Sequence, residues 1–573
     1  MIARNGSIDW LCLPDLDSPS VFAAIVDRER GGSFALQPVE QFEATRRYRD
    51  DSNVLETTFT TAAGRARLVD AMLFPGEGLE AQRELVRTIE GVSGHVEFEL
   101  CFEPRFDYGR RQPRLHIRDG VGYAMTAGDT FALQVWPQGD LTVERGAIRG
   151  GLRVAAGEGA LVMLASGHGE PLVLPAPAEI ERRLELTDDY WRTWIEKRTY
   201  DGPWREQVMR SALALKLLVH APTGAVAAAP TTSLPEQIGG ERNWDYRYSW
   251  VRDSALTIEA FLSIGCAAEA RSFFWWLLHA SQISRPRLNV FYRLDGGTRA
   301  KERTLPLTGS RGSAPVRIGN GALHQLQLDI YGNLLQAAWL FARDGQRIDA
   351  DIGKRLAATA DHVARVWTQK DAGIWEVRSE PLHFTQSKMM CWLALERALE
   401  LAEAGAVPAE HVDEWRVELE RIGEFVETRC WSEHKRSYSR YAGGEELDAS
   451  VLLALIFGYG DDLERTASTV DAIQHELAEG LYVRRYLRND GLHGEEGAFL
   501  TCSFWLVEAL AQVGRADEAR ALMDALVGRV NDVGLLSEEI DPTSDEFLGN
   551  FPQGLSHIGL IRAAVACGLG ARR

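Results

Sequence analysis

The chain lacks any apolar run of 18 or more residues, the length typical of a membrane-spanning helix. Its first residues also lack the charged and apolar regions of a signal peptide. Cysteines are few and scattered, without Cys-x-x-Cys spacing, at positions 12, 101, 266, 391, 430, 502 and 567. This pattern argues against a disulfide framework and a zinc site, so we expect a cytoplasmic protein with reduced, mostly buried thiols.

Basic residues are outnumbered, with 63 Lys and Arg against 82 Asp and Glu and a formal net charge of −19. Such a surface repels phosphate backbones and anionic lipids, so we expect neither a nucleic-acid nor a membrane partner. The remaining composition, 45% hydrophobic and 25% charged, is that of a globular protein. At 573 residues the chain is long enough for two or more domains.

Several catalytic motifs are missing. The sequence contains no GxxxxGK[ST] phosphate loop, no HExxH zinc motif and no GxSxG nucleophile elbow. His324, His383 and His493 lack metal-ligand spacing, and hydrogen bonding is the more frequent role of such histidines. These absences argue against nucleotide, zinc-protease and serine-hydrolase chemistry.

The first 175 residues carry the period of β-strands. Val96, Phe98, Leu100 and Phe102 alternate with polar or small side chains, as in a sheet with one wet face. Many short strands with turn signals between them predict an antiparallel β-sandwich over residues 1–175. Apolar residues at helical spacing then predict a linker helix over 176–200.

From residue 201 to 573 the period changes to 3.6, and twelve apolar stretches predict helices. They lie near 205–219, 253–264, 266–281, 322–343, 351–368, 384–404, 408–428, 448–459, 463–477, 498–513, 515–529 and 555–567. Short and long connections alternate, so antiparallel neighbours would place every long loop at one end. Six helical hairpins in a ring would give an (α/α)6 barrel; an irregular helical solenoid is the alternative.

Four long loops concentrate carboxylates, arginines and tryptophans. The motifs are Arg242–Asp253, Gly373–Arg378, Arg484–Glu496 and Ser537–Pro542. Aromatic rings cover the apolar faces of a sugar, and arginine and carboxylate side chains bond its hydroxyl groups. The same residues taken one motif at a time are equally explained as helix caps and salt bridges, but four motifs on alternating loops favour a sugar site.

At these residues the chain resembles glycoside hydrolase family 15, the glucoamylases and bacterial trehalases. The resemblance spans nearly the whole length. It is carried by Gly6–Cys12, Asp17–Phe22, Trp250–Leu256, Pro315–Asn320, Gln327–Gly332 and Gly549–Gln553. It implies an N-terminal β-sandwich, a catalytic (α/α)6 barrel, and hydrolysis of an α-glucoside from its non-reducing end with inversion.

The resemblance also implies roles for individual residues. Glu376, after Trp375, is expected to be the general acid, and Glu538 the general base, with the adjacent Glu539 as the other choice for the base. The residues expected to bind the substrate are Trp250, Arg252, Asp253, Trp375, Arg485, Glu539 and Asp490; Glu496 and Asp329 are weaker candidates. Such chemistry requires no metal and no cofactor, only a small α-linked carbohydrate as partner.

An inverting mechanism sets two geometric and electrostatic expectations. The two carboxyls should stand roughly 6.5–9.5 Å apart to admit a water molecule. Glu376 should be protonated and Glu538 ionised, which requires a less polar or more acid-crowded setting for the acid than for the base.

We favour α,α-trehalose as the substrate. Maltose, isomaltose or longer α-glucans remain the alternative within hydrolases, and Gln386 and Asn333 depart from the family pattern in a way that bears on the second sugar's subsite. A disaccharide phosphorylase and a non-catalytic sugar-binding protein are more remote alternatives. The sequence leaves open whether the protein forms a homo-oligomer.

Overall fold

The computed structural model describes residues 1–74, 83–169, 171–487 and 496–569. It divides into two compact units, Met1–Lys197 with Leu305–Ser310, and Arg198–Thr304 with Arg311–Arg573. The segment Leu305–Ser310 belongs to the first unit because Asp27 accepts a hydrogen bond from the Thr308 N–H (3.0 Å) and Arg30 donates to the Pro306 carbonyl (2.6 Å).

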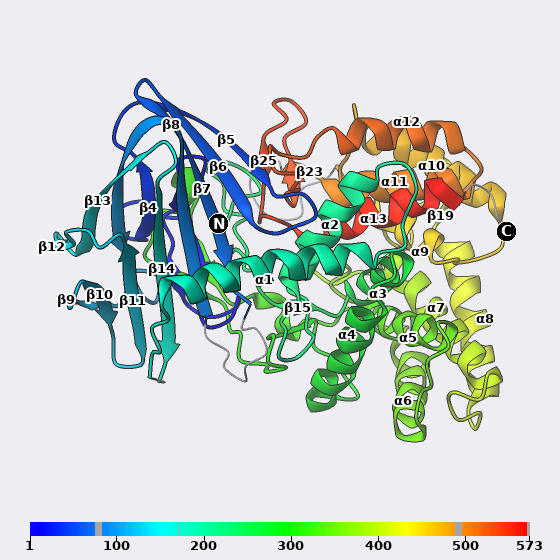
Figure 1. Ribbon diagram of the computed structural model, residues 1–573. Coiled ribbons are helices and arrows are strands. Elements are labelled where there is room, and N and C mark those ends of the chain that lie inside the picture. Colours follow the sequence, from blue (N-terminus) through cyan, green and yellow to red (C-terminus); the bar gives the residue numbers. More distant parts are fainter. Residues whose placement is uncertain (75–82, 170, 488–495, 570–573) are drawn as a thin grey trace. The chain divides into compact units, whose positions relative to one another are not determined.

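The first unit contains a large antiparallel sheet, with twelve strands within the described residues. Figure 1 shows these strands in blue to cyan. They are β1 (Ser7–Ile8), β4 (Ser33–Pro38), β5 (Phe42–Tyr48), β6 (Leu55–Thr61), β7 (Gly64–Met72), β8 (Arg83–Glu103), β9 (Arg114–Arg118), β10 (Val121–Met125), β11 (Asp129–Trp136), β12 (Thr142–Glu144), β13 (Ala147–Ala155) and β14 (Gly159–His168). Two further strands, β2 (Leu11–Cys12) and β3 (Ser20–Phe22), pair with each other.

Strand β8 joins two groups of strands. Its first half pairs with β7 and β14, and its second half pairs with β4 and β13. Phe59 and Leu68 of the first group share one buried cluster with Phe98 and Leu100 of the second half of β8. The alternation predicted for this segment is therefore confirmed, because its apolar side chains enter a common core.

Helix α1 (Pro177–Glu196) follows the sheet and belongs to the first unit. It falls inside the segment 176–200 predicted as a linker helix. Proline at its first position suits a helix start, since that residue's missing N–H would have no partner within the helix.

The second unit is helical. Within its described residues, each of the twelve predicted stretches overlaps one α-helix. They are α2 (Arg205–Leu218), α3 (Ser254–Ser263), α4 (Ala267–Ala280), α5 (Asp329–Arg343), α6 (Ala350–Val366), α7 (Thr385–Glu403), α8 (Val412–Arg429), α9 (Ser450–Ile456), α10 (Leu463–Leu477), α11 (Leu500–Gln512), α12 (Ala516–Val527) and α13 (Gly554–Leu569). Helix α5 begins at Asp329, seven residues later than predicted.

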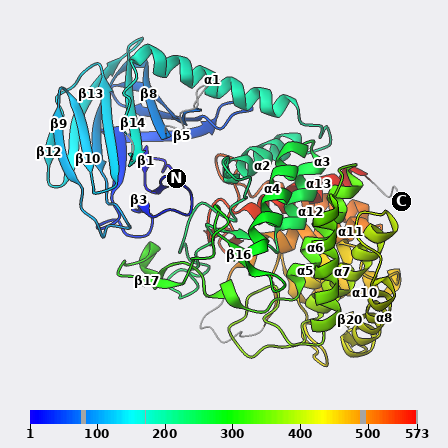
Figure 2. The ribbon, with the colours of Figure 1, turned by 90° about the horizontal axis from the view of Figure 1, so that it is seen from below.

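Alternate helices of this unit contact one another in a closed series. Helix α3 packs on α5, α5 on α7, α7 on α9, α9 on α11, α11 on α13, and α13 on α3 again. Figure 2 shows α5 and α7 side by side. Helix α9 is buried along its whole length, whereas α8 buries only Trp415, Ile422 and Val426. A helix that is apolar on all sides lies inside a unit, and one with a narrow apolar stripe lies outside.

The long connections between these helices carry short strands and 3₁₀ turns. The strands are β15 (Ser249–Trp250), β16 (Phe291–Tyr292), β17 (Arg303–Leu305), β18 (Val316–Ile318), β19 (Trp431–Ser432), β20 (Ser437–Tyr438), β21 (Ala478–Glu479), β22 (Tyr482–Val483), β23 (Ala498–Phe499), β24 (Glu539–Ile540) and β25 (Phe547–Leu548). The turns are η1 (Ser281–Ser284), η2 (Ser310–Gly312) and η3 (Gly321–His324). None of the helices in the described ranges is long and apolar enough to cross a lipid bilayer.

Candidate active site

Residues from several of these long connections line one pocket of the helical unit. They are Glu236, Arg242, Trp244, Tyr246, Asn320, Ala322, Trp375, Glu376, Val377, Arg378 and Arg485. Three of the four motifs predicted to meet at one end supply residues to this lining. The fourth adjoins it through Glu538, which lies close enough to Glu236 to raise the pKa of the Glu236 carboxyl.

Strand β15 and the start of α3 position one wall of the site. Trp250 pairs with Phe291 of β16, and its buried ring stacks on the Phe291 ring with centroids 4.6 Å apart. Arg252 and Asp253 follow directly, and Arg252 Nε donates to Asp253 Oδ1 at 2.8 Å. Both are buried, at 6% and 7% exposed, so this ion pair holds the guanidinium in one orientation.

Glu376 lies against this wall. Its Oε1 accepts a hydrogen bond from Trp250 Nε1 at 2.6 Å and one from Arg252 Nη1 at 3.2 Å. The backbone of Glu376 has φ 58°, a left-handed conformation that is costly for a residue with a side chain. Arg252 Nη1 also donates to the Ile374 carbonyl at 3.0 Å, which ties the strained turn to the same guanidinium.

Glu538 is held by a second turn. Its Oε2 accepts the Asn550 N–H at 2.9 Å, and its own N–H donates to the Asn550 carbonyl at 3.1 Å. Gly549 has φ +72°, and a Cβ at that position would lie 2.6 Å from Glu538 Oε2. Glycine is therefore required here both for the backbone conformation and for the space that Glu538 occupies.

The surroundings of the two carboxyls differ from the sequence-based expectation. Burial raises the pKa of Glu538 to about 7, against the opposing effects of the Asn550 N–H, Arg485 and Arg252. Burial also raises the pKa of Glu376, but Arg252 and the Trp250 N–H act to lower it. The cationic Arg252 thus contacts Glu376, the proposed acid. The less polar setting that was expected for the acid surrounds Glu538, the proposed base.

Tyr246 is a pocket residue that our sequence analysis did not single out. Its side chain is 8% exposed, and burial together with the nearby Glu376, Glu538 and Glu236 raises its pKa well above the usual value. Its phenol therefore stays neutral beside these carboxyls. The signal available in the sequence was its position four residues before Trp250, on which its ring packs with centroids 4.8 Å apart.

Arg485 lies at the centre of a buried group of carboxylates. It donates through Nε to Glu496 Oε1 at 2.9 Å and through Nη2 to Glu236 Oε2 at 3.3 Å, and its Nη2 is 3.5 Å from Glu539 Oε1. Its guanidinium also lies over the Trp375 ring, 5.2 Å from the centroid. The predicted residues Trp375, Arg485, Glu496 and Glu539 are thus brought together, and Glu236 joins them without any signal in its own sequence neighbourhood.

The same carboxylates are the candidate metal ligands in the described part of the chain. One oxygen each from Glu236, Glu496 and Glu539 lies within 4.8 Å of the others. Arg485 ion-pairs with all three, and Arg242 Nη1 lies 3.3 Å from Glu496 Oε2. These two guanidinium groups already supply the positive charge that a cation would bring.

Burial and its acidic neighbour Glu236 raise the pKa of Glu539 well above its usual range. Its side chain is fully buried beside Arg485. A raised pKa disfavours the ionised form that a general base needs to take a proton from water.

The remaining predicted residues fall in other places. Asp329 is fully buried at the start of α5, where burial raises its pKa to about 7. Asn333 and Gln386 are buried within α5 and α7 and are not among the residues that line the pocket. Asp490 and His493 lie outside the described residues.

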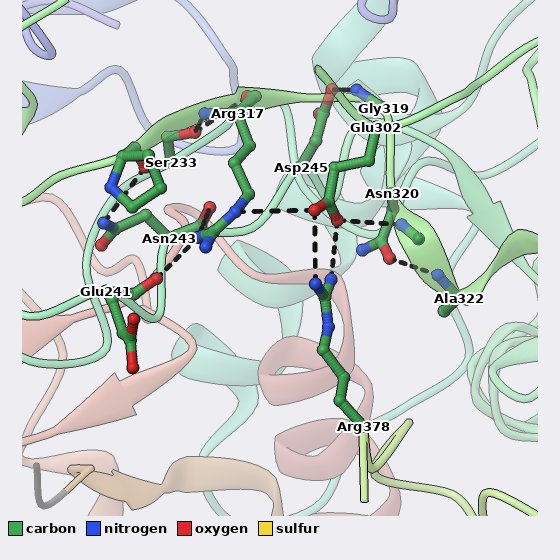
Figure 3. A network of polar contacts seen from close by, with 12 residues as sticks. Ser233, Glu241, Asn243, Asp245, Glu302, Arg317, Gly319, Asn320, Ala322 and Arg378 are labelled. Carbon is green, nitrogen blue, oxygen red and sulfur yellow. Dashed lines mark hydrogen bonds and ion pairs between the residues drawn. The ribbon is translucent and has the colours of Figure 1, made fainter. Parts of the chain in front are cut away.

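A second polar network adjoins the pocket, and Figure 3 shows its residues. Glu302 accepts from Arg378 Nη2 at 2.6 Å and from the Gly321 N–H at 2.9 Å, and its carboxylate lies 3.7 Å from Arg317 Nε. Arg317 and Arg378 also lie over the Trp244 ring, 4.4 and 4.1 Å from its centroid. The motifs Pro315–Asn320 and Gly373–Arg378 contain Arg317 and Arg378, but no pattern in the sequence links these residues to Glu302.

Comparison with known proteins adds to this geometry. Residues 202–565 match the sequence model of the glycosyl hydrolases family 15, and residues 1–175 match that of the trehalase-like N-terminal region. The chain is 36% identical to a protein of Thermoplasma acidophilum named trehalase, over 98% of this chain and 97% of that protein. It is 38% identical to a trehalase of Mycolicibacterium smegmatis, over 99% of this chain and 88% of that protein.

Solved structures show the same fold at low sequence identity. A bacterial glucoamylase complexed with acarbose superposes with a TM-score of 0.73 at 13% identity, covering 99% of this chain and 91% of the glucoamylase. A wild-type glycosidase superposes with a TM-score of 0.52 at 19% identity, covering 64% of this chain and 96% of that one. With a family match over more than half of its length and relatives of 36–38% identity along nearly all of it, the chain belongs to the glycosyl hydrolases family 15.

Proposed function

We propose that the chain is an inverting, exo-acting α-glucoside hydrolase whose substrate is α,α-trehalose. The observation that carries the proposal is the convergence of two buried carboxyls, Glu376 and Glu538, on the buried Tyr246, with Arg252 acting on both. The trehalase name of the relatives at 36–38% identity supports the choice of substrate.

In the proposed reaction Glu376 donates a proton to the glycosidic oxygen as the bond from the anomeric carbon to that oxygen breaks. Glu538 takes a proton from a water molecule, whose oxygen bonds to the anomeric carbon from the opposite face. One trehalose and one water thus give one β-glucose, from the attacked ring, and one α-glucose, from the departing ring. The proton that Glu538 gains and the one that Glu376 loses balance.

The contacts of Glu376 suggest which oxygen carries its proton. Oε1 accepts two hydrogen bonds, from Trp250 and Arg252, so a proton on the neutral carboxyl belongs on Oε2. Hydroxyls of the first glucose compete for the guanidinium of Arg252. Loss of that cation from Oε1, together with exclusion of water by the sugar, raises the pKa of Glu376 and keeps it protonated in the complex.

Glu538 rather than Glu539 is proposed as the base. Glu538 receives the Asn550 N–H, which favours its ionised form, and its pKa near 7 is matched to taking a proton from water at neutral pH. Burial and the neighbouring Glu236 raise the pKa of Glu539 well above its usual range, which disfavours the ionised form that a base needs. We assign Glu539 to the support of Arg485, and Trp250, Arg252, Asp253, Trp375 and Arg485 to the first glucose; the binding role of Asp490 stays a prediction.

We further propose that the fold is an antiparallel β-sandwich over 1–175, a linker helix over 176–200 and a catalytic (α/α)6 barrel over 201–573. The closed series of contacts through α3, α5, α7, α9, α11 and α13 supports an inner ring of six helices. The shared core of the two strand groups joined by β8 supports the sandwich. A cytoplasmic location remains a prediction.

A substrate panel tests the function. Purified protein is incubated with trehalose, maltose and isomaltose, each with and without inorganic phosphate, and released glucose is measured. We expect phosphate-independent release that is fastest from trehalose. Preference for maltose or isomaltose would indicate a glucoamylase type, release that requires phosphate would indicate a phosphorylase, and binding without release would indicate a sugar-binding protein.

A further inference from the structure

One wall of the pocket is built by residues that the proposed mechanism does not use. Trp244, Asn320, Ala322 and Arg378 line the pocket together with Glu376. Arg378 stands two residues after Glu376 in the same connection. Its side chain is 38% exposed, against 6% for Arg242 and 8% for Arg485, the other arginines that line the pocket, so it is the one most open to a ligand.

Arg378 is fixed in place by Glu302. The carboxylate accepts from Nη2 at 2.6 Å and from Nη1 at 3.3 Å, a two-point contact that sets the plane of the guanidinium. Although burial acts to raise it, the pKa of Glu302 is lowered by the hydrogen bonds from Arg378 and the Gly321 N–H. Glu302 is therefore ionised at neutral pH and keeps its hold on Arg378.

Trp244 restrains the same guanidinium from its ring face, with Arg378 Cζ 4.1 Å from the ring centroid. Two of the five N–H groups of an arginine are used on Glu302, and within the described residues the other three have no hydrogen-bond acceptor. An arginine restrained in this way loses little conformational entropy when it binds a ligand.

Asn320 adds a donor close by. Its Oδ1 accepts the Ala322 N–H at 2.9 Å, which fixes the direction of the amide, as Figure 3 shows. No acceptor in the described part of the chain takes its Nδ2. Arg378 and Asn320 thus present oriented N–H donors, and these suit the hydroxyl oxygens of a sugar ring.

We infer that Arg378 and Asn320 bind the hydroxyls of the departing sugar, with Glu302 and Trp244 as the residues that position Arg378. A general acid must stand at the oxygen between the two sugars. Trp250 and Arg252, assigned to the first sugar, contact Oε1 of Glu376, and Arg378 lines the same pocket two residues further along the chain. This inference rests on the proposed function and identifies the part of the site that selects the second ring.

The test compares substrates with and without a departing sugar. In α-D-glucosyl fluoride a fluoride ion replaces the second ring, so contacts to that ring contribute nothing. We expect Arg378→Gln to lower kcat/KM for trehalose by about 10- to 100-fold, the range for a lost charge-assisted hydrogen bond. Its kcat/KM for glucosyl fluoride should stay within about twofold of wild type, which also reports that the variant is folded.

A matched control has the same three residue types outside the pocket. On α8, Arg421 Nη1 donates to Glu418 at 2.6 Å, and Arg421 lies over the Trp367 ring at 5.9 Å. Arg421→Gln should leave kcat/KM for both substrates unchanged. Arg378→Lys should recover part of the loss, since it keeps the charge and gives up the two-point contact with Glu302.

Two results for Arg378→Gln would overturn the inference. One is an equal loss of kcat/KM for both substrates, which would mean that Arg378 supports Glu376; the other is no loss of kcat/KM for either substrate. Failure of the proposed function is seen separately in the wild-type protein. If wild type cleaves glucosyl fluoride but not trehalose, the substrate assignment fails and maltose takes the place of trehalose in the same comparison. If it cleaves no glucoside at all, the function and this inference are both wrong.

Discussion

The indole N–H of Trp250 donates to Oε1 of Glu376 at 2.6 Å. Arg252 reaches the same oxygen, and the acid's other oxygen, Oε2, has no hydrogen-bond donor among the described residues. This asymmetry orients the carboxyl before any substrate is present, so that its Oε2 is left for the glycosidic oxygen.

The first prediction concerns the two carboxyls. Glu376→Gln and Glu538→Gln should each reduce kcat for trehalose by a factor of about 10² or more, since each removes a proton transfer that the reaction needs. Circular dichroism and the melting temperature should stay close to those of wild type. Near-wild-type turnover by either variant would show that the substituted residue is not the general acid or base assigned to it.

Trp250→Phe tests the contact between the indole and the acid. The Trp250 N–H acts to lower the pKa of Glu376, so its loss should raise that pKa. A hydrogen bond of about 0.5–1.5 kcal/mol corresponds to a shift of up to about one pH unit. In the pH profile of kcat/KM, the limb that reports Glu376 should move to higher pH while the other limb stays. Identical profiles would show that the contact does not tune the acid.

Glu236 should make stability depend on pH. Burial raises its pKa from 4.5 to about 8. For a carboxyl raised on folding, the folded state holds more protons than the unfolded state between these values, so the stability it contributes is lost as pH rises through this window. Glu236→Gln should therefore gain stability relative to wild type from pH 5 to pH 8. Urea unfolding at both pH values measures this, and a difference in unfolding free energy, variant minus wild type, that falls with rising pH would contradict it.

Gly549→Ala should damage both stability and activity. The residue has φ +72°, and its new Cβ would meet Glu538 at 2.6 Å. Gly480→Ala is the matched control, because Gly480 has φ +64° and nothing within 4 Å of an added Cβ. Both variants should lose about 1 kcal/mol from backbone strain, and only Gly549→Ala should also lose most of its kcat. Equal activity in the two would show that the turn does not position Glu538.

The helices could be predicted from the sequence because their apolar period is long and regular. All twelve stretches overlap helices, and the largest differences are in α5, which begins at Asp329 rather than near residue 322, and in α9, which is reduced to Ser450–Ile456. The site residues could be predicted from the sequence where one motif holds several interacting residues, as in Trp250–Asp253. They could not be predicted where partners come from distant connections: Glu236 reaches Arg485, and Glu302 reaches Arg378, only through the tertiary fold.

The electrostatics were the least predictable part. The setting expected for the acid surrounds Glu538, because β24, the Asn550 turn and the Arg485 cluster together shield it from bulk solvent. Burial of this kind is a product of packing and leaves no mark in the local sequence. The positions of Gln386 and Asn333, which depart from the family pattern, were likewise not predictable from the local sequence. Both lie inside helices rather than in the pocket lining.

The most direct test of the account is a proton NMR time course of the purified protein with trehalose, following the anomeric signals from the first minutes. The proposed mechanism predicts that α- and β-glucose appear in equal amounts before mutarotation changes their ratio. Release of α-glucose alone would mean retention and would contradict the assignment of Glu376 as acid and Glu538 as base.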